Sequence, residues 1–414
     1  MTAFVTRRPW RGRWIALAGI VLVGLNLRIA VAAVSPILGQ VRADVALSDP
    51  LVGVLGTIPV ASFAVFGSLA PLLARRFGLE VTLIAAMVLS AGGEIVRSAT
   101  STPTGFLGWT VIALAGMGMG NVLLPPLVKK YFPDRIGAVT ATYSMAMAVS
   151  TTLPALLAVP VAARIGWRLT LGAWSVIGLL AVVPWAVVLA TSASNRAERA
   201  GPARRSPSGT RTAAQGAPGQ VWRSPLAWSL AVMFAMNSLN AYVMFAWLPR
   251  ILTDAGLSAD AGGRWLAVFA ILGLPCSFIV PPLAVRMRNP RALLYVFAAC
   301  FVVGYLGLML SPAHGTAVWM VFVGLGPGAF PLALTLLNLR TRTAAGAVAL
   351  SGFVQGVGYA ISGVGPVLVG VLFAATGTWT GAFVFLLGTV VALVVGGTAA
   401  CRPGILEDTW GPAS

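Results

Sequence analysis

The feature that most constrains this chain is a series of long apolar runs, each long enough to cross a lipid bilayer as a single helix. A membrane-spanning helix needs about 20 mostly apolar residues, and its backbone polar groups must be satisfied within the helix itself. Only 9% of the residues are charged, whereas a soluble domain has about 25%. We therefore predict an all-α integral membrane protein with twelve spans, at 14–38, 51–74, 81–100, 106–128, 137–161, 169–191, 226–249, 263–285, 291–311, 316–338, 345–374 and 379–401.

The distribution of basic residues predicts the orientation of these spans. The net charge of +18 could indicate a nucleic-acid partner, but the basic residues gather on one side of the spans. That side, with both termini, holds 21 of the 28 basic residues, and the other side holds Arg42, Arg164, Arg168, Arg250 and Arg264. Because cytoplasmic loops are enriched in Lys and Arg, we expect a multi-pass protein of the bacterial plasma membrane with both termini in the cytoplasm. The basic residues would then meet anionic lipid headgroups and no nucleic acid.

One long polar segment separates the spans into two groups of six. Residues 192–224 consist mainly of Arg, Ser, Gly, Pro and Ala, and such a segment cannot bury an apolar core. We predict an N-terminal six-helix half at 1–191, a flexible cytoplasmic linker at 192–224, a C-terminal six-helix half at 225–402 and a cytoplasmic tail at 403–414.

The two halves repeat each other at an offset close to 210 residues. The segment NLRIAVAAVSPILGQVRADVALSD (26–49) parallels NSLNAYVMFAWLPRILTDAGLSAD (237–260), and GMGMGN (116–121) parallels GLGPGA (324–329). Parallel six-helix repeats are the plan of a large class of secondary transporters, in which the substrate site lies between the halves near the bilayer midplane. We therefore expect the two repeats to surround a central cavity, and the glycine-rich runs to allow close helix packing.

Specific short motifs are distributed over both halves: NLR (26–28), GNVLLPPLVKKYFPDR (120–135), TYSMAM (142–147), GWR (166–168), AWLP (246–249), LALTLLNLRTR (332–342), SGFVQGVGYAISGVGP (351–366) and TGTW (376–379). They resemble the cyanate permease and 2-nitroimidazole transporter branch of the major facilitator superfamily. The resemblance implies alternating-access secondary transport of a small anionic or weakly acidic solute: a cyanate-like ion, a carboxylate or a nitro-heterocycle. The chain departs from the family pattern at Arg75, where the superfamily's loop-based gating contact is then not implied. It also departs at Ala241 and Pro327, where substrate could touch, which leaves the substrate open.

Arg28 lies in the middle of the first apolar run, ten or more residues from either end. A guanidinium stays protonated, and an arginine at a helix centre costs about 2.5–3.5 kcal/mol of insertion free energy. At about 15 Å from the interface, the side chain cannot reach water by extending along the helix. We expect Arg28 to face the cavity and anchor an anion, because its planar fork matches carboxylate, cyanate or nitro oxygens. A buried structural ion pair is the alternative.

Glu94 and Arg97 are the other charged residues within a span, and a spacing of three places them on one helix face. A mutual ion pair is the simplest interpretation. Glu94 is also the one carboxylate inside the predicted spans, so proton coupling through a buried acid would use it. If Glu94 is only structural, the transport would be uniport or exchange.

Neutral polar and aromatic residues complete the candidate substrate site. The resemblance implies that helices 1, 4, 5, 7, 10 and 11 line the cavity, and these helices carry Asn26, Asn121, Tyr143, Asn237, Asn240, Tyr242, Trp247, Asn338, Gln355 and Tyr359. Amide side chains also join membrane helices, at about 0.6 kcal/mol per contact. Tyr242 and Trp247 could stack on a flat substrate, although Trp247 also suits the interfacial aromatic belt.

We expect neither an enzyme nor a metal or cofactor site. The one histidine, His314, and the cysteines Cys276, Cys300 and Cys401 have no ligand spacing, and no nucleophile–base constellation is present. The expected partners are a small-molecule substrate and the lipid bilayer, with protons as a possible coupling ion and a monomer as the expected state. The rival function is proton-coupled export of an antimicrobial or drug-like molecule, although the central charge has the wrong sign for a cation.

Overall fold

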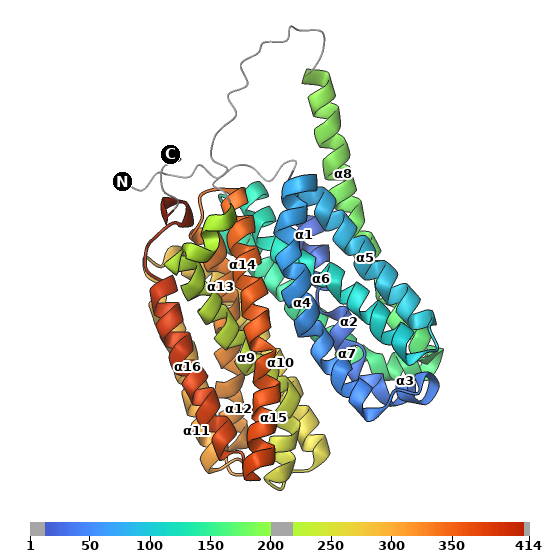
Figure 1. Ribbon diagram of the computed structural model, residues 1–414, viewed down its shortest axis with the longest axis vertical. Helices are drawn as coiled ribbons and strands as arrows, with labels where there is room; N and C mark the ends of the chain where they lie inside the picture. Colours follow the sequence, from blue (N-terminus) through green and yellow to red (C-terminus); the bar gives the residue numbers. More distant parts are fainter. Residues whose placement is uncertain (1–12, 200–217, 410–414) are drawn as a thin grey trace.

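The computed structural model describes residues 13–199 and 218–409, and these residues form two bundles of helices that lie side by side (Figure 1). The N-terminal bundle contains α1 (Trp14–Asn26), α2 (Ile29–Ala32), η1 (Ser35–Ile37), α3 (Leu38–Val45), α4 (Asp49–Phe77), α5 (Leu79–Ala99), α6 (Pro103–Tyr131), α7 (Ile136–Ala173) and α8 (Ser175–Arg199). The C-terminal bundle contains η2 (Pro218–Arg223), α9 (Pro225–Asp254), α10 (Ala259–Arg286), α11 (Arg291–Leu310), α12 (Thr316–Leu325), η3 (Gly326–Gly328), α13 (Ala329–Leu339), α14 (Ala344–Ser362), α15 (Val364–Thr376), α16 (Thr380–Ala400) and η4 (Leu406–Thr409).

The described helices account for twelve membrane spans. Eleven helical stretches in the described chain are long and apolar enough to cross a bilayer, and one of them, Ile136–Thr191, has 56 residues. Within this stretch Gly166 has a φ of 80°, which ends one helix and lets the next begin in a new direction. The stretch is therefore two spans, and the predicted all-α fold with twelve spans is confirmed.

Three predicted spans contain breaks that their apolar pattern does not reveal. The first span is divided between α1 and α2, where Arg28 adopts φ −124° and ψ −7°. The tenth is divided by η3, because Pro327 has no amide hydrogen with which to continue the helical hydrogen bonds. The eleventh is divided at Gly363, between α14 and α15.

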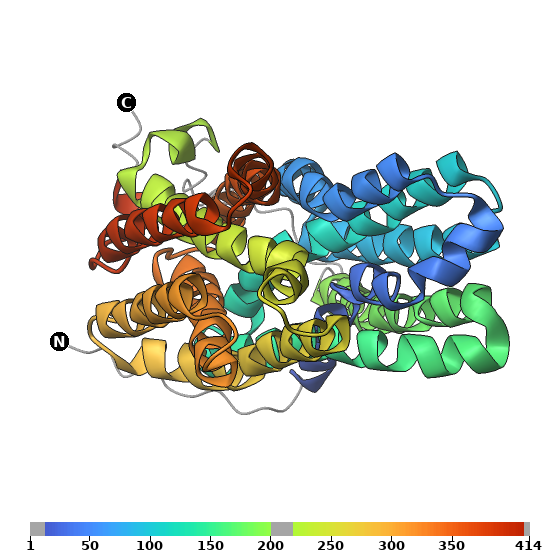
Figure 2. The same cartoon turned by 90° about the horizontal axis from the view of Figure 1, so that it is seen from below.

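The two ends of the molecule differ in charge. We define the basic face as the end at which α4, α6 and α10 finish with Arg75–Arg76, Lys129–Lys130 and Arg286, and the far face as the opposite end. In Figure 1 the halves meet at the basic face and diverge toward the far face, which Figure 2 views end-on.

Small side chains and proline make the contact between the halves close at the basic face. Gly352 of α14 packs against Pro71 of α4, and a Cβ atom on Gly137 of α7 would lie 3.1 Å from the Cα of Pro282 in α10. These contacts leave no space for a larger side chain. The basic-face ends of α4 and α7 are therefore closed against α14 and α10.

The same hydrogen bond closes each half at the far face. In the N-terminal half, Trp167 Nε1 donates to Asp44 Oδ2 over 2.8 Å. In the C-terminal half, Trp379 Nε1 donates to Asp254 Oδ2 over 3.0 Å. Asp44 and Asp254 are 210 positions apart, so the two bonds are equivalent in the repeat that the sequence predicts.

The glycine-rich runs bring helices together within each half. A Cβ atom on Gly116 of α6 would lie 2.6 Å from the backbone nitrogen of Ser90 in α5, and one on Gly326 would lie 2.5 Å from the ring of Phe301 in α11. Since real Cβ atoms do not approach so closely, these positions require glycine. This agrees with the packing role expected for both runs.

The predicted linker and tail are only partly covered by the described chain. Helix α8 continues to Arg199 and η2 begins at Pro218, so the described residues leave 200–217 of the predicted linker 192–224 outside. In the predicted tail, η4 folds back onto the start of α14, where the Glu407 carboxylate accepts hydrogen bonds from the backbone amides of Arg342 and Thr343 at 3.0 Å each.

Candidate functional site

Arg28 lies at the break between α1 and α2 and reaches into the opposite half. Its Nη1 donates to the hydroxyl of Tyr242 in α9 over 3.5 Å, and its Nη2 donates to the hydroxyl of Tyr359 in α14 over 3.2 Å. The guanidinium carbon also lies 5.2 Å from the centre of the Phe63 ring in α4, a cation–π distance. Within residues 13–199 and 218–409, no carboxylate forms an ion pair with Arg28.

The Tyr359 hydroxyl connects Arg28 to a chain of polar contacts between α6 and α14. Asn121 Nδ2 donates to this hydroxyl over 2.6 Å. Gln355 Nε2 donates to the backbone carbonyl of Asn121 over 3.4 Å and to Ser351 Oγ over 2.8 Å. The residues at 351, 355 and 359 follow one another at intervals of four, so they share one face of α14. We call Arg28, Phe63, Asn121, Tyr242, Ser351, Gln355 and Tyr359 the Arg28 cluster.

The cluster combines a positive charge with hydrogen-bonding groups that are not fully used. The Tyr359 hydroxyl accepts bonds from both Arg28 and Asn121, so its own hydrogen is committed to neither. Asn121 Oδ1 and Gln355 Oε1 are buried without a hydrogen-bond partner. Since neutral hydroxyls are weaker acceptors for a guanidinium than an anion is, a small anion could displace them and bind Arg28.

Three of the residues predicted for the site lie elsewhere and join helices within one half. Asn26 donates to Ser90 of α5 over 2.9 Å. Asn240 donates to Thr389 of α16 over 2.9 Å, and the indole of Trp247 donates to a backbone carbonyl in α15 over 2.9 Å. None of these hydrogen bonds involves a residue of the Arg28 cluster.

Tyr143, Asn237 and Asn338 are buried and have polar atoms without partners. With the residues that the structure describes, the Tyr143 hydroxyl, Asn237 Oδ1 and both side-chain polar atoms of Asn338 make no hydrogen bond. The backbone of Tyr143 lies against Gly24 of α1, where a Cβ atom would come within 3.0 Å of its carbonyl oxygen. Their role in substrate binding stays a prediction.

The family of the chain follows from its similarity to known proteins. Residues 16–363 match the sequence model of the Major Facilitator Superfamily. The chain belongs to this family. It is 33% identical over 374 residues to the 2-nitroimidazole transporter of Escherichia coli (strain K12), covering 89% of this chain and 91% of that protein. It is 26% identical over 379 residues to the cyanate transport protein CynX of the same strain, covering 91% of this chain and 94% of that protein.

Solved structures of the superfamily share the fold. The proton:xylose symporter XylE superposes with a TM-score of 0.73 at 15% sequence identity, covering 96% of this chain and 99% of that chain. The protein is therefore a multi-pass membrane transporter of a small molecule in the cyanate and 2-nitroimidazole branch of the superfamily, and it is not an enzyme.

In this transporter Glu94 and Arg97 lie on one face of α5, with 0% and 1% of their surfaces exposed. Among the described residues they form no ion pair, with each other or with another side chain. Arg97 Nη1 instead donates to the carbonyl of Ala30 in α2 over 3.1 Å, and neither carboxylate oxygen of Glu94 has a hydrogen-bond partner. The mutual pair expected from their spacing is thus not formed in this conformation.

Lys129 joins the halves at the basic face. Its Nζ donates to the backbone carbonyls of Asn338 over 2.8 Å and Thr341 over 2.5 Å, at the end of α13. From the sequence, Lys129 is interpreted mainly as a signal of membrane topology. Its bond to Asn338 could not be predicted, because a backbone acceptor 209 residues away has no recognisable sequence pattern.

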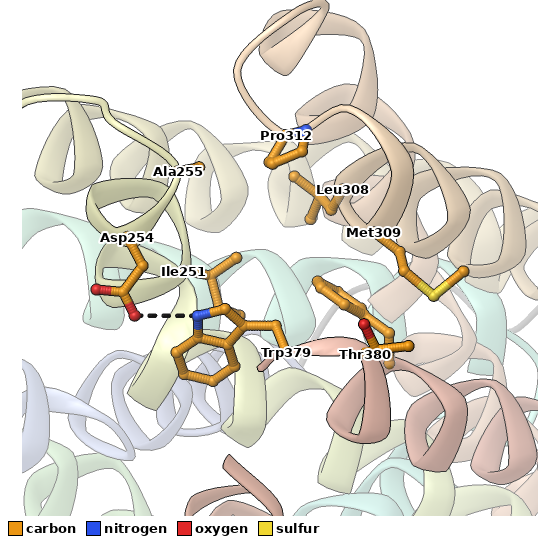
Figure 3. Close-up of a pocket in the computed structure, with 9 residues that line it drawn as sticks. Ile251, Asp254, Ala255, Leu308, Met309, Pro312, Trp379 and Thr380 are labelled. Atoms are coloured by element: carbon orange, nitrogen blue, oxygen red, sulfur yellow. Dashed lines mark hydrogen bonds between the residues drawn. The ribbon is translucent and has the colours of Figure 1, made fainter. Parts of the chain in front are cut away.

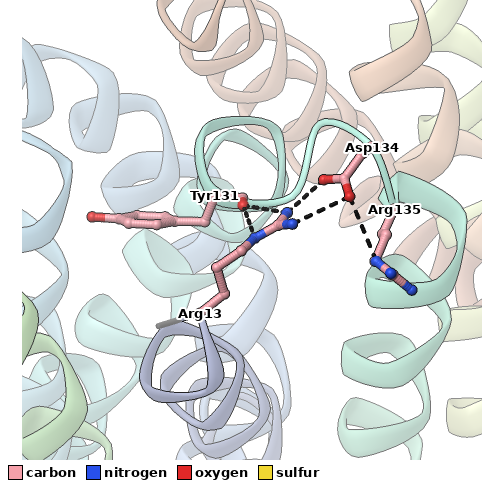
Figure 4. Close-up of polar contacts among 4 residues, drawn as sticks. All are labelled: Arg13, Tyr131, Asp134 and Arg135. Atoms are coloured by element: carbon pink, nitrogen blue, oxygen red, sulfur yellow. Dashed lines mark hydrogen bonds and ion pairs between the residues drawn. The ribbon is translucent and has the colours of Figure 1, made fainter. Parts of the chain in front are cut away.

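The turn after Lys129 is fixed by a network around Asp134 (Figure 4). Arg13 donates to the carbonyl of Tyr131 over 2.6 Å and to Asp134 over 2.5 Å, and Arg135 lies 3.5 Å from the same carboxylate. The hydrogen bond from Arg13 holds the pKa of the Asp134 carboxyl below its ordinary value. The network ties the start of α1 to the α6–α7 turn within the N-terminal half.

A cavity of about 180 Å³ lies at the far-face end of the C-terminal half, between α9, α11 and α16 (Figure 3). Its lining is mainly apolar, and its one charged residue is Asp254, which Trp379 already engages. No residue of the Arg28 cluster lines it. Because it offers an anion no positive charge, we do not assign it to the substrate.

Two members of the Arg28 cluster were not predicted from the sequence. Phe63 is one of several aromatic residues in an apolar span, and nothing in its spacing distinguishes it from a lipid-facing side chain. Ser351 stands one helical turn before Gln355, so the four-residue spacing Ser351–Gln355–Tyr359 was a signal that could have indicated a polar face.

Proposed function

We propose that this transporter moves a small anionic or weakly acidic solute across the membrane by alternating access, with Arg28 as the anion anchor. The observation that carries the proposal is the guanidinium at the α1–α2 break, which donates to two tyrosine hydroxyls of the opposite half and pairs with no described carboxylate. A guanidinium binds an anionic acceptor more strongly than a neutral hydroxyl, because both partners of the bond are then charged. An entering anion is therefore a better partner for Arg28 than either hydroxyl.

The same contacts suggest how binding is coupled to movement. In this conformation the halves are joined at the basic face, by Lys129 among others, and diverge toward the far face. We propose that the anion enters from the far face and binds Arg28. Its charge compensates the guanidinium, which lowers the cost of closing the far-face ends of the two halves around the site.

The aromatic residues around Arg28 suit a small flat or linear solute. The Tyr359 ring lies 5.3 Å from Phe63 and 6.5 Å from Tyr242, measured between ring centres. The relatives are named for cyanate, a linear anion, and for 2-nitroimidazole, a planar nitro-heterocycle. Asn121, Gln355 and the tyrosine hydroxyls would complete the hydrogen bonds to such a solute.

The orientation and assembly are part of the proposal. We place the basic face in the cytoplasm of a bacterial cell, with the protein in the plasma membrane, because lysines and arginines gather at that face. Residues 192–224 would then link the two six-helix halves on the cytoplasmic side, and the tail at 403–414 would be cytoplasmic. We expect a monomer. Alkaline phosphatase fused after Leu257, in the far-face turn, should be active, and a fusion after Gly315 should be active too.

A second candidate is proton-coupled export of an antimicrobial or drug-like molecule. The aromatic rings of Phe63, Tyr242 and Tyr359 favour it, because they could stack on a planar neutral heterocycle without help from a charge. In either direction of transport, Glu94 is the candidate for proton coupling, as a buried carboxylate without partners. A deletion strain that becomes more sensitive to nitro-heterocycles, while its cyanate uptake stays unchanged, would favour export.

The test begins with a thermal-shift screen of cyanate, small carboxylates and nitro-heterocycles on the purified protein. Uptake of the most stabilising compound is then measured in proteoliposomes with Arg28→Ala and with Arg75→Ala, an exposed arginine of the basic face, as the matched control. We expect Arg28→Ala to abolish uptake and Arg75→Ala to retain it. Uptake by Arg28→Ala at the wild-type rate, at equal protein amounts, would refute the anchor.

A further inference from the structure

Helix α5 holds the broken first span through two hydrogen bonds, one on each side of the break. On the α1 side, Asn26 Nδ2 donates to Ser90 Oγ over 2.9 Å. On the α2 side, Arg97 Nη1 donates to the Ala30 carbonyl over 3.1 Å. Arg28 lies between these two anchored positions, so its placement depends on both bonds. The Ile29 carbonyl accepts from the amide of Ala33, but the last carbonyls of a helix have no donor within it. The Ala30 carbonyl is satisfied by the donor from α5 instead.

Glu94 lies on α5 between the two anchors and has no hydrogen-bond or ion-pair partner among the described residues. It is 0% exposed, and both carboxylate oxygens are without a hydrogen bond. An ionised carboxylate that is neither hydrogen-bonded nor ion-paired is very costly inside a protein. The burial and missing contacts therefore indicate that Glu94 carries a proton in this conformation.

Arg97, one turn along α5, lies on the same helix face as Glu94. The neighbouring helices α1, α2, α6 and α8 contribute neutral residues to this part of α5: Asn26, Ala30, Phe106, Ala113 and Gly178. Helix α4 also packs against α5, and its arginines lie in its last turn, at the basic face. From α7, Arg168 reaches only the carbonyls of Ser98 and Thr100 at the end of α5. Within the described chain, Arg97 is therefore the one counter-ion available to a Glu94 that has lost its proton.

Helix α5 itself has little freedom to respond to such a change. A Cβ atom on Gly93 would lie 2.5 Å from the backbone nitrogen of Ala113, and one on Gly116 would lie 2.6 Å from the nitrogen of Ser90, so α5 and α6 are in backbone contact. The response must then come from the Arg97 side chain and from α2, to which it donates.

We propose that Glu94 and Arg97 form a proton-controlled clamp on the α1–α2 break and thereby position Arg28. With Glu94 protonated, Arg97 is free to donate to Ala30 and holds α2 in place. When Glu94 releases its proton to water, its carboxylate draws the guanidinium away from Ala30, and α2 loses this anchor. One proton is taken up when the clamp reforms. The clamp rests on the proposed anion site at Arg28, which it regulates, and Arg97 is a positioning residue.

The first experiment detects the proton on Glu94 without any substrate. Infrared difference spectra of the purified protein are recorded across a pH titration, because a protonated carboxyl buried in protein gives a separate C=O stretching band that disappears on ionisation. We expect this band in the wild type and not in Glu94→Gln. A wild type without the band at any pH, or an unchanged band in Glu94→Gln, would overturn the proposal.

The second experiment follows α2. Val31, next to Ala30, is 37% exposed, and Val54 of α4 is 47% exposed. Each is replaced by Cys in a protein whose native cysteines, all buried, are changed to Ala. The ratio of maleimide labelling at Val31→Cys to that at Val54→Cys removes the pH dependence of thiol chemistry. We expect this ratio to rise by about tenfold as Glu94 ionises, as expected for the loss of about one charge-assisted hydrogen bond.

The variants separate the clamp from a structural role of either residue. Glu94→Gln should keep the ratio at its low-pH value throughout, Arg97→Gln should keep it high throughout, and Arg97→Lys should restore part of the pH dependence. A ratio that changes with pH in Arg97→Gln as it does in the wild type would refute the role of Arg97. Neither experiment uses a transported solute, so both can succeed even if Arg28→Ala shows that the anchor is wrong.

Discussion

Removing the Tyr359 hydroxyl tests the central contact between the halves. In Tyr359→Phe, Arg28 loses an acceptor at 3.2 Å and Asn121 loses one at 2.6 Å, while the ring contacts with Phe63 and Phe234 remain. A neutral hydrogen bond contributes about 0.5–1.5 kcal/mol and one to a charged group about 1.5–3 kcal/mol. Since the Arg28 bond is long, we take the lower value for it and expect a loss of about 2–3 kcal/mol in the free energy of unfolding.

The measurement is unfolding of the purified protein in mixed detergent micelles, followed by tryptophan fluorescence, and the analysis is a double-mutant cycle. Combining Tyr359→Phe with Asn121→Ala should give a coupling energy of about 1 kcal/mol, because the two residues share one hydrogen bond. Tyr305 is the matched control, since its hydroxyl is equally buried but donates to Asn240 within the C-terminal half. Tyr305→Phe with Asn121→Ala should be additive. Additivity in the Tyr359 cycle as well would show that the described contact does not join the halves.

Three further predictions concern other contacts. Arg28→Lys keeps the charge but not the fork, so affinity for cyanate in a calorimetric titration should fall about tenfold; an unchanged affinity would argue against fork recognition. The Cβ atom of Gly346→Ala would overlap the Glu407 carboxylate, so this variant should lose about 1–3 kcal/mol of unfolding free energy. Adding Glu407→Ala should recover part of that loss. If it recovers none, the overlap with Glu407 is not the cause. Because Arg13 lowers the pKa of Asp134 from its ordinary value of 3.8, this carboxylate contributes stability above that pH, which is lost as the pH falls through the lowered pKa; Asp134→Asn should flatten the acid end of the stability profile, and an unaltered profile would contradict this.

The sequence was sufficient for the span count and for the repeat, because both depend on local composition. Apolar length identifies each span whatever its neighbours are, and the far-face bonds of Asp44 and Asp254 follow from a repeat visible in the sequence. The breaks at Arg28 and Gly363 were not predictable in this way. An apolar run reads the same whether its helix continues or bends, and the bend depends on donors from other helices, such as Arg97.

The site was predicted in part for a related reason. Arg28, Asn121, Tyr242, Gln355 and Tyr359 were singled out as polar residues in apolar spans, and the structure brings them together. The same criterion also selects residues that join helices within one half. In the sequence, an amide residue in an apolar span looks the same whether it binds substrate or joins two helices. Only the rotation of each helix separates the two, and a twelve-helix arrangement fixes that rotation through contacts that are distant in sequence.

The break beside Arg28 explains why a duplicated fold can carry one central charge. The repeat that aligns Asn26 with Asn237 aligns Arg28 with Leu239. Helix α9 is continuous at this point, and the Leu239 side chain fills the space beside Gly365 of α15. An arginine copied into position 239 would therefore be buried against a neighbouring helix, without water or an acceptor. The two halves therefore differ in backbone at this position: the break in the first span accommodates a charged side chain, and the continuous helix α9 does not. The twofold repeat of the fold is not kept at the site itself.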